Sequence, residues 1–427
     1  MAKQQPKAWK HHFVPRSLLK YFKGSGDGEF LYTFDKRFRR SFRASLMNTG
    51  SQNGYNSLEA EEEVVNFESE FDDVDALLVA SLRDVHAHGM KALRMPEQRA
   101  VWLDLLTVQL LRAPIVRSTM QTFMEDLAAS VEPLFGKNVA VPVPTENDTR
   151  KAARGMFQKR ESIRASLADK DFILFEPAGD ACFLISDRPV CISNPNPYGD
   201  VGLASPGVTV FMPLGPQFLL GLLCPSVRYR LNKHPLEALD LEPDVAAGLI
   251  ALREALSNGT SLQWNDDEVQ RHNALQVAHA SRFVYGPSDD FDEVLAIMDA
   301  NPYVGEVRSS IHVGKMGHAP ERRSAMPMGK WLILFGQHDS YMLEITDVAR
   351  GQPLEVTVLN APALAGALAD GPFSEMQYFE DQQQRQGMRD VQLERSSENP
   401  HRVRVLHSDP ALNALVEVIN RTRKGNV

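Results

Sequence analysis

Two adjacent histidines near the start of the chain, His11 and His12, are the side chains best suited to chemistry. Imidazole can bind a divalent metal ion or transfer a proton near neutral pH. Neighbouring side chains of an extended backbone point to opposite faces, so the two imidazoles cannot enter the same core. Pro15 suits the first turn of a helix, because it has no amide hydrogen and a fixed φ. The segment therefore predicts an imidazole at the start of a short helix, with Arg16 beside it to hold an anion.

The His-His-x-x-Pro spacing is similar to the metal-finger core of HNH-type nucleases, in which one histidine activates water for attack on phosphate. The chain departs from that pattern, because the next histidine after His12 is His86. The alternative interpretation makes His12 a buried, hydrogen-bonded residue that fastens the N-terminal segment to the core. Both interpretations stay open from the sequence.

A run of carboxylates follows at residues 57–75, which hold nine acidic residues and no basic one. We predict one long helix here, from Ser57 to about Gly89, with Glu63 and Glu70 seven residues apart on one face. Paired carboxylates can bind Mg²⁺ or Mn²⁺, or act as acid and base. The competing interpretation is a solvated helix start that is rich in Glu because the helix dipole favours negative charge there.

The first 43 residues are basic, with eleven Lys and Arg against three Asp and Glu. Such an arm is suited to contact with the phosphates of nucleic acid. It could equally face the acidic run of residues 57–75, so that Arg16 or Lys20 reaches Glu63 or Glu70. The sequence predicts a nucleic-acid partner on the first interpretation and an internal charge pairing on the second.

Three more polar residues stand in unusual surroundings. Arg112 lies in a strongly apolar helix and needs a carboxylate or phosphate partner. Asp187 lies where a strand ends in a tight turn, which suits either an exposed functional side chain or an Asx-turn. Asn273 lies on a predicted helix next to His272, in a polar strip that is typical of a surface as well as of a site.

Four stretches of the chain together resemble the DUF4238 family of uncharacterised bacterial proteins. They are residues 10–22, residues 109–114, residues 183–190, and Asn273 with residues 280–285. Arg188 departs from the small polar residue expected at that position of the family pattern. The resemblance covers roughly residues 8–290, and it implies that polar residues of these stretches converge on one cleft, namely His11 or His12, Arg16, Asp187 and Asn273.

The composition is ordinary for a globular protein, with 43% hydrophobic and 24% charged residues among 427 and a net charge of −9. No apolar run approaches the ~20 residues that span a bilayer, and residues 1–10 contain no apolar signal segment. Three cysteines lie inside apolar, strand-like runs: Cys182, Cys191 and Cys224. This placement indicates buried thiols in a protein of a reducing compartment. We therefore expect a cytoplasmic protein with no membrane partner.

The hydrophobic periodicity predicts an α+β fold. We expect one DUF4238-like domain over residues 1–302, mostly helical to residue 170 and then a small antiparallel sheet with helices, followed by an α+β module over residues 303–427. In the first domain we predict a hairpin at 29–46, short strands between 171 and 224, and helices from Pro96 and at 116–134, 148–169, 244–256 and 266–281. In the C-terminal module we predict strands at 330–335, 338–345 and 354–359, and helices at 363–368 and 410–418.

Two classes of function follow. The first is a metal-dependent, nuclease-like enzyme that acts on nucleic acid in defence or toxicity, with Mg²⁺ or Mn²⁺ as cofactor. Its candidate residues are His11, His12 and Asp187 for catalysis, Arg16, Arg112 and Asn273 for substrate binding, and Glu63 and Glu70 for the metal. The second is a non-catalytic binding or sensor protein in which the His-His-x-x-Pro segment is structural. No sequence feature indicates the oligomeric state.

Overall fold

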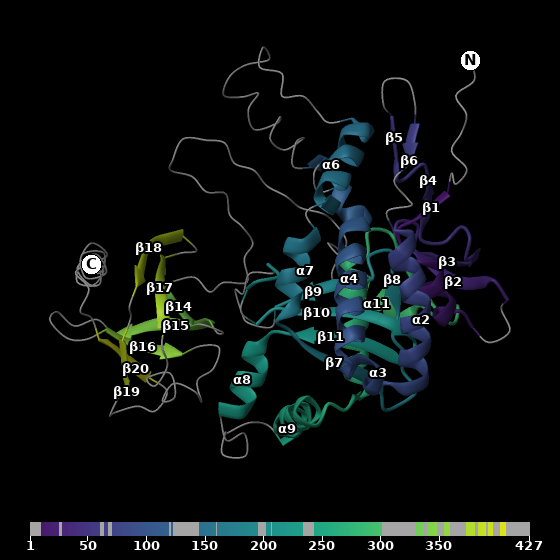
Figure 1. Ribbon diagram of the computed structural model, residues 1–427. Coiled ribbons are helices and arrows are strands. Elements are labelled where there is room, and N and C mark those ends of the chain that lie inside the picture. The colour runs from purple at the N-terminus through teal and green to yellow at the C-terminus, as the bar shows by residue number, and fades with distance from the viewer. Residues whose placement is uncertain are drawn as a thin grey trace, which may run out of the picture. The chain divides into compact units, whose positions relative to one another are not determined.

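The computed structural model shows the predicted α+β fold (Figure 1). It describes residues 10–24, 28–59, 64–66, 71–118, 121–122, 145–158, 160–194, 202–205, 207–233, 243–300 and the strands between 330 and 406 whose bounds are given below. The predicted boundary at residue 303 falls outside these ranges and stays a prediction. None of the described helices is both long and apolar enough to cross a lipid bilayer.

The N-terminal segment begins with strand β1 (Lys10–His12), which pairs antiparallel with β4 (Ser51–Asn53). Directly after Pro15 the chain forms helix α1 (Arg16–Leu19) and then a 3-10 turn, η1 (Lys20–Phe22), as the proline predicts. Its apolar stripe is fully buried, at Leu18, Leu19 and Phe22.

The close approach between this segment and the loop before β4 depends on Gly50. The carbonyl oxygen of Gly50 accepts hydrogen bonds from the amides of Phe13 and Val14, at 2.8 and 3.1 Å. Gly50 has a φ of 59°, and a Cβ at this position would lie 2.8 Å from the Cβ of Val14. Only glycine fits this contact without strain.

The predicted hairpin is confirmed and belongs to an antiparallel four-stranded sheet of order β3-β2-β13-β8. Its strands are β2 (Phe30–Asp35), β3 (Arg40–Ser45), β13 (Phe283–Gly286) and β8 (Ile185–Ser186). One face packs on helices α10 (Asp266–His279) and α11 (Asp292–Ala300), where Phe34 and Val284 contact Phe291. Strand β3 forms one edge of this sheet, and its first four residues are exposed.

A second sheet has five strands in the order β12-β7-β11-β10-β9. The strands are β12 (Leu262–Trp264), β7 (Asp171–Pro177), β11 (Phe218–Leu223), β10 (Thr209–Gly215) and β9 (Cys191–Ser193). Strand β12 was not predicted, and it pairs parallel with β7, so this sheet is mixed. Helix α9 (Pro243–Asn258) precedes β12 and provides the long connection that a parallel strand requires.

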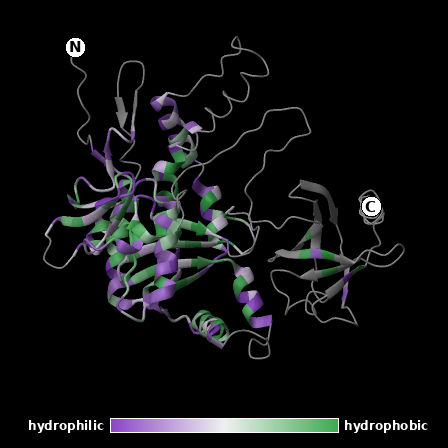
Figure 2. Cartoon of the chain, turned by 180° about the vertical axis from the view of Figure 1, so that it is seen from behind, coloured by the Kyte–Doolittle hydropathy of each residue, from purple (hydrophilic) through white to green (hydrophobic). Residues whose placement is uncertain are grey.

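The predicted helix from Pro96 is confirmed as α4 (Pro96–Arg112), with Trp102 fully buried. It packs against α2 (Asp72–His88), α3 (Met90–Arg94), α6 (Glu146–Gln158) and α7 (Arg160–Ala168). Helices α2, α3 and α4 lie side by side along one face of the strands (Figure 1). Figure 2 shows hydrophobic residues on the strands and hydrophilic residues on the outward sides of the helices.

Helix α4 ends as predicted, because Ala113 is extended (ψ 142°) before Pro114. Residues 114–118 and 121–122 are helical again, and the rest of the helix predicted at 116–134 lies outside the described residues. The helix predicted at 148–169 is divided into α6 and α7. Helix α8 (Pro225–Lys233) was not predicted.

The single helix predicted from Ser57 to Gly89 is wrong in its first part. Strand β5 (Ser57–Glu59) pairs antiparallel with β6 (Val64–Asn66), and α2 begins only at Asp72. Carboxylates four residues apart repel each other in a helix, and the adjacent β-branched residues of β6 favour a strand. The predicted end is confirmed, because Gly89 terminates α2 with a φ of 57°.

The C-terminal strands form an antiparallel seven-stranded sheet of order β18-β17-β14-β15-β16-β20-β19. They are β14 (Lys330–Gly336), β15 (Ser340–Asp347), β16 (Leu354–Val358), β17 (Phe373–Glu380), β18 (Gln383–Arg389), β19 (Gln392–Arg395) and β20 (Arg402–Leu406). Leu332 and Leu343 are paired and buried on neighbouring strands. The first three strands were predicted, and the helices predicted at 363–368 and 410–418 lie outside the described residues.

Candidate functional site

His11 is a buried structural residue. Its side chain has no exposed surface, and its Nδ1 accepts a hydrogen bond of 2.7 Å from the backbone amide of Asn56. This bond ties β1 to the turn between β4 and β5. The structural role that the sequence assigns to His12 therefore belongs first to His11.

His12 points to the other side of β1 and is half-buried, as the alternation along a strand requires. Burial lowers its pKa, and the positive charges of Arg16 and Lys10 act in the same direction. Hydrogen bonds with the backbone of Leu46 and Met47 oppose the shift. The net effect is a neutral imidazole at pH 7.

Arg16 forms an ion pair of 3.6 Å with Glu29, and both side chains are well exposed. The carboxylate beside Arg16 thus comes from the start of the hairpin. Among the described residues, no three His, Cys, Asp or Glu side chains gather as metal ligands. The candidate ligands Glu63 and Glu70 lie outside the described residues, so their pairing with the basic arm stays a prediction.

Arg112 has the carboxylate partner that its apolar helix demands. Its Nη1 lies 2.9 and 3.1 Å from the two carboxylate oxygens of Asp75 on α2. Its Nε donates to the side chain of Gln109, and Gln109 in turn donates to the carbonyl oxygen of Phe13 at 2.7 Å. This buried group joins α4 to α2 and to the N-terminal segment.

Asp187 is saturated by backbone amides. Its carboxylate accepts hydrogen bonds from the amides of Ser281, Arg282 and Phe283, at 2.8, 2.8 and 2.9 Å. The side chain is buried, and burial raises its pKa although the three amides act against this shift. Asp187 thus holds the turn that follows α10, neither as an exposed functional group nor as a local Asx-turn.

Lys36 was not predicted as a special residue, yet it is a buried cation. Its Nζ donates to the carbonyl oxygens of Val277 and Ala280, at 2.6 and 2.8 Å, and so satisfies the C-terminal end of α10. Burial lowers the pKa of Lys36 to about 8, and the charge of Asp187 opposes this shift. In the sequence Lys36 is one of five basic residues among positions 36–43, and nothing there distinguishes it.

Asn273 fastens α10 to the segment before β8. Its side-chain oxygen accepts from the amide of Leu184 at 2.9 Å, and its nitrogen donates to the carbonyl of Cys182 at 3.0 Å. One turn further, Gln276 accepts from Ser186 Oγ and donates to the carbonyl of Pro189, both at 2.9 Å. The polar strip on α10 is therefore buried, and it joins the helix to residues 182–189.

The four signature stretches do meet, but they meet inside the protein. Tyr285 is fully buried and lies within electrostatic range of Asp187. Tyr55 lies within the same range, and its hydroxyl donates to the carbonyl oxygen of Arg112 at 3.1 Å. The predicted site residues at this junction and along α10 are almost fully buried: His11, Arg112, Asp187 and Asn273. Their polar groups bond to other parts of the chain, so these residues of the signature stretches hold the domain together.

His272, next to Asn273, is fully buried among aromatic rings. It meets Phe183 and Phe211 edge-on, with centroids 5.7 and 5.5 Å away, and Trp264 lies at 6.5 Å. Neither ring nitrogen has a hydrogen-bond partner in the described part of the chain. Burial, with a smaller contribution from His279, lowers the pKa of His272 to about 3.

The most unusual exposed feature is the tip of the β2–β3 hairpin. We call Arg37, Phe38, Arg40 and Phe42, together with Arg282, the arginine–phenylalanine tip. Phe38 is 55% exposed, and three guanidinium carbons lie within 5.4–5.6 Å of its ring centroid, those of Arg37, Arg40 and Arg282. The basic arm that the sequence singled out thus presents cations around an exposed aromatic ring.

The charges at this tip are only partly neutralised. Arg282 forms an ion pair of 2.7 Å with Asp35, and Arg39 one of 2.6 Å with Asp299. For Arg37 and Arg40, the described residues supply no carboxylate within ion-pair distance. The tip therefore carries uncompensated positive charge.

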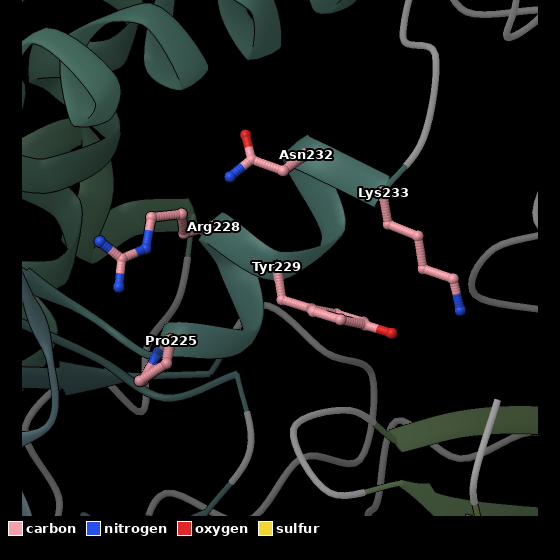
Figure 3. A pocket seen from close by; sticks show the side chains of 5 residues that line it. All are labelled: Pro225, Arg228, Tyr229, Asn232 and Lys233. Atoms are coloured by element: carbon pink, nitrogen blue, oxygen red, sulfur yellow. The ribbon is translucent and has the colours of Figure 1, made fainter.

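Among the described residues, a shallow depression on α8 is lined by that helix. Its lining residues are Pro225, Arg228, Tyr229, Asn232 and Lys233. Figure 3 shows that their side chains spread along the helix in different directions and do not converge on one point. The arrangement is that of a helix surface, without the convergent polar groups of a ligand site.

Comparisons with known proteins bear on the signature stretches. No curated protein and no solved structure matches the chain. One family model, described as "Protein of unknown function (DUF4238)", matches residues 10–290. This span contains all four signature stretches and about two thirds of the chain, so the protein belongs to the DUF4238 family.

Proposed function

We propose that this protein binds nucleic acid through the arginine–phenylalanine tip, and that its His-His-x-x-Pro segment is structural. The observation that carries the proposal is the exposed ring of Phe38 with three guanidinium groups around it. Five of the eight residues 36–43 are Lys or Arg. Arginine is the side chain that best combines contact with phosphate and stacking on aromatic rings.

The position of the tip on an edge strand supports the same role. The first four residues of β3 are exposed, and the charges of Arg37 and Arg40 face solvent. Each Arg that neutralises a phosphate releases condensed counterions, which favours binding at low salt. Two buried residues of the hairpin give this surface a rigid base, because Lys36 bonds to the end of α10 and Asp35 to Arg282, directly before β13.

The test measures binding of a fluorescent oligonucleotide by anisotropy over a series of salt concentrations. Wild type is expected to bind, and the Arg37→Ala/Arg40→Ala variant is expected to bind more weakly. The slope of log K against log salt should become shallower by about 1.4, that is about 0.7 for each phosphate of a single strand that the variant no longer neutralises. Removal of two exposed helix arginines, Arg83→Ala/Arg271→Ala, is the matched control. Equal slopes in all three proteins would contradict the proposal.

Metal-dependent cleavage of nucleic acid is the second candidate function. It is favoured by one observation, the neutral, half-buried imidazole of His12 beside the cations Arg16 and Lys10. Such a base can accept a proton from water near a bound phosphate. Incubation of the bound nucleic acid with and without Mg²⁺ or Mn²⁺, for wild type and a folded His12→Ala variant, tests it. Metal-dependent cleavage that is lost in His12→Ala would support the nuclease, and intact nucleic acid would leave binding as the function.

The setting that we propose is the cytoplasm of a bacterial cell. All three cysteines are free thiols, and Cys191 and Cys224 are buried. Burial raises the pKa of Cys191 far above the usual value of a thiol, which keeps it protonated and unreactive. A reducing compartment suits such thiols.

A further inference from the structure

Resting on the proposed function, we infer that the bound nucleic acid is single-stranded and that one of its bases stacks on Phe38. The tip then contacts a base as well, whereas the proposed function requires contact with phosphates alone. It follows from the way in which the three guanidinium groups around Phe38 are held.

Only one of these three guanidinium groups is fixed in place. Arg282 donates to both carboxylate oxygens of Asp35, with Nη2 at 2.7 Å and Nε at 3.2 Å. Asp35 is buried and itself held, since the amide of Arg37 donates to it at 3.0 Å. Arg282 is thus a rigid and neutralised support on one side of the Phe38 ring.

Arg37 and Arg40 differ from Arg282 in both respects. Both are exposed, and no described carboxylate pairs with them. Each rests near the ring at 5.6 and 5.4 Å and can leave it for a phosphate without breaking an ion pair that the structure describes. Movement of either arginine to a phosphate uncovers an aromatic face on which a base can stack.

The turn that carries Phe38 is held in an unusual conformation. Arg39 has a φ of 50°, the one left-handed residue other than glycine among the described residues. The conformation costs free energy for a side chain with a Cβ. The bond from the amide of Arg37 to buried Asp35 holds the turn, and an exposed ion pair joins Arg39 to Asp299. The turn therefore holds Phe38 in a defined direction, so that less conformational entropy is lost on binding.

A second exposed ring extends the path along one face of β3. Arg40 and Phe42 are two residues apart and share a face of the strand, opposite Asp35 and Thr33 of β2. Phe42 is 41% exposed. Arg43 lies on the other face, where it covers Phe30 at 5.4 Å. Phe38, Arg40 and Phe42 thus give the series ring, cation, ring. This series matches the alternation of bases and phosphates along a flexible single strand.

This arrangement favours a single strand over a duplex. In a duplex each base is covered on both faces by its neighbours, and its edges are reached by an element that enters a groove. A ring at the tip of a hairpin can stack only on a base whose face is free. The cations beside the ring then contact the phosphates of that same nucleotide or the next.

The experiment compares the affinities of labelled oligo(dT), longer than the ~16 nucleotides of a large single-strand site, and of the same strand annealed to its complement. Wild type is expected to prefer the single strand. Phe38→Ala should weaken single-strand binding about tenfold, the order found when a stacking ring is removed, and leave its salt slope unchanged. Phe38→Trp should restore the affinity, and Phe38→Leu should not. Arg43→Ala, on the opposite face of the same strand, is the matched control and should lower single-strand affinity much less than Arg40→Ala.

The outcomes separate base stacking from phosphate contact. Equal binding of single strand and duplex, with no effect of Phe38→Ala, would overturn the stacking inference while the phosphate contacts of the proposed function stand. Absence of binding to either oligonucleotide would overturn both. Binding to vesicles of anionic lipid without binding to oligo(dT) would overturn both in favour of a membrane surface. Because Phe38 is exposed, its variants should keep the wild-type melting temperature, which the same preparations can verify.

Discussion

The carboxylate of Asp187 accepts a hydrogen bond of 2.8 Å from the backbone amide of Arg282, 95 positions away in the sequence. The bond joins the end of β8 to the turn that leads from α10 into β13. It stabilises the turn that positions Arg282 beside Phe38 in the arginine–phenylalanine tip. Assembly of the fold and shape of the surface thus depend on the same contact.

Asp187→Asn should lower the free energy of unfolding by about 2–3 kcal/mol, because a side-chain NH₂ would then face backbone N–H donors in the core. Asp290→Asn, on an exposed aspartate, is the control and should change stability by less than about 0.5 kcal/mol. Urea denaturation measures both. Equal stabilities of the two variants would show that the buried amides do not need the carboxylate.

Substitution of only one partner of the ion pair between Arg112 and Asp75 should strongly lower the free energy of unfolding. Asp75→Asn leaves a buried guanidinium with reduced compensation and should cost about 3 kcal/mol. The double variant Asp75→Asn/Arg112→Met should be less destabilised than the sum of its two single variants. The more exposed pair of Arg164 and Asp104 is the control, with a cost of about 0.5 kcal/mol for Asp104→Asn. A strictly additive cycle at Arg112 would contradict this account.

The two adjacent histidines should differ in their effect on stability. His11→Ala removes the acceptor of the Asn56 amide from the core and should cost about 2 kcal/mol or more. His12→Ala removes a half-buried ring and should cost less. Thermal melting of both variants measures the difference. A larger loss in His12→Ala would reverse the structural roles assigned here.

His272 should make the protein sensitive to acid. Its pKa is near 3 in the folded protein and ordinary in the unfolded chain, so only the unfolded chain binds the proton between these values. The stability is present above pH 6.5 and falls as the pH drops towards 3, by up to ~1.4 kcal/mol for each pH unit. In His272→Leu this slope should be smaller by up to one proton, whereas His88→Leu, on an exposed histidine, should keep it. Parallel stability–pH curves for wild type and His272→Leu would exclude this cause.

The sequence predicted those parts of the fold that depend on local pattern. Pro96 and the apolar period that follows it define α4, and Gly89 ends α2. The error at Ser57 has a physical origin. The helical spacing of the acidic residues does not exclude a strand, and the pairing of β5 with β6 is what selects one. Strands β18 and β19 carry many polar residues and lack the alternation by which a half-buried strand is recognised, whereas β20 alternates and was missed.

The candidate site was predictable only in part. The need of Arg112 for a carboxylate follows from its apolar helix, but the choice of Asp75 depends on the packing of α2 against α4. His11 and Asp187 were selected for chemistry, and the structure commits them to backbone amides that no local pattern reveals. The basic arm was visible as a charge excess, whereas the gathering of Arg282 with Arg37 and Arg40 requires β13 to pair with β2.

Photochemical cross-linking tests the central claim most directly, because it locates the nucleic acid on the protein. An oligo(dT) strand that carries a photoreactive 5-bromouracil is bound to the full chain and irradiated, and the linked peptides are identified by mass spectrometry. We expect the linked residues within 37–43, with Phe38 foremost, and a loss of that product in Phe38→Leu. Cross-links confined to another surface, such as the basic residues of α8, would contradict the account.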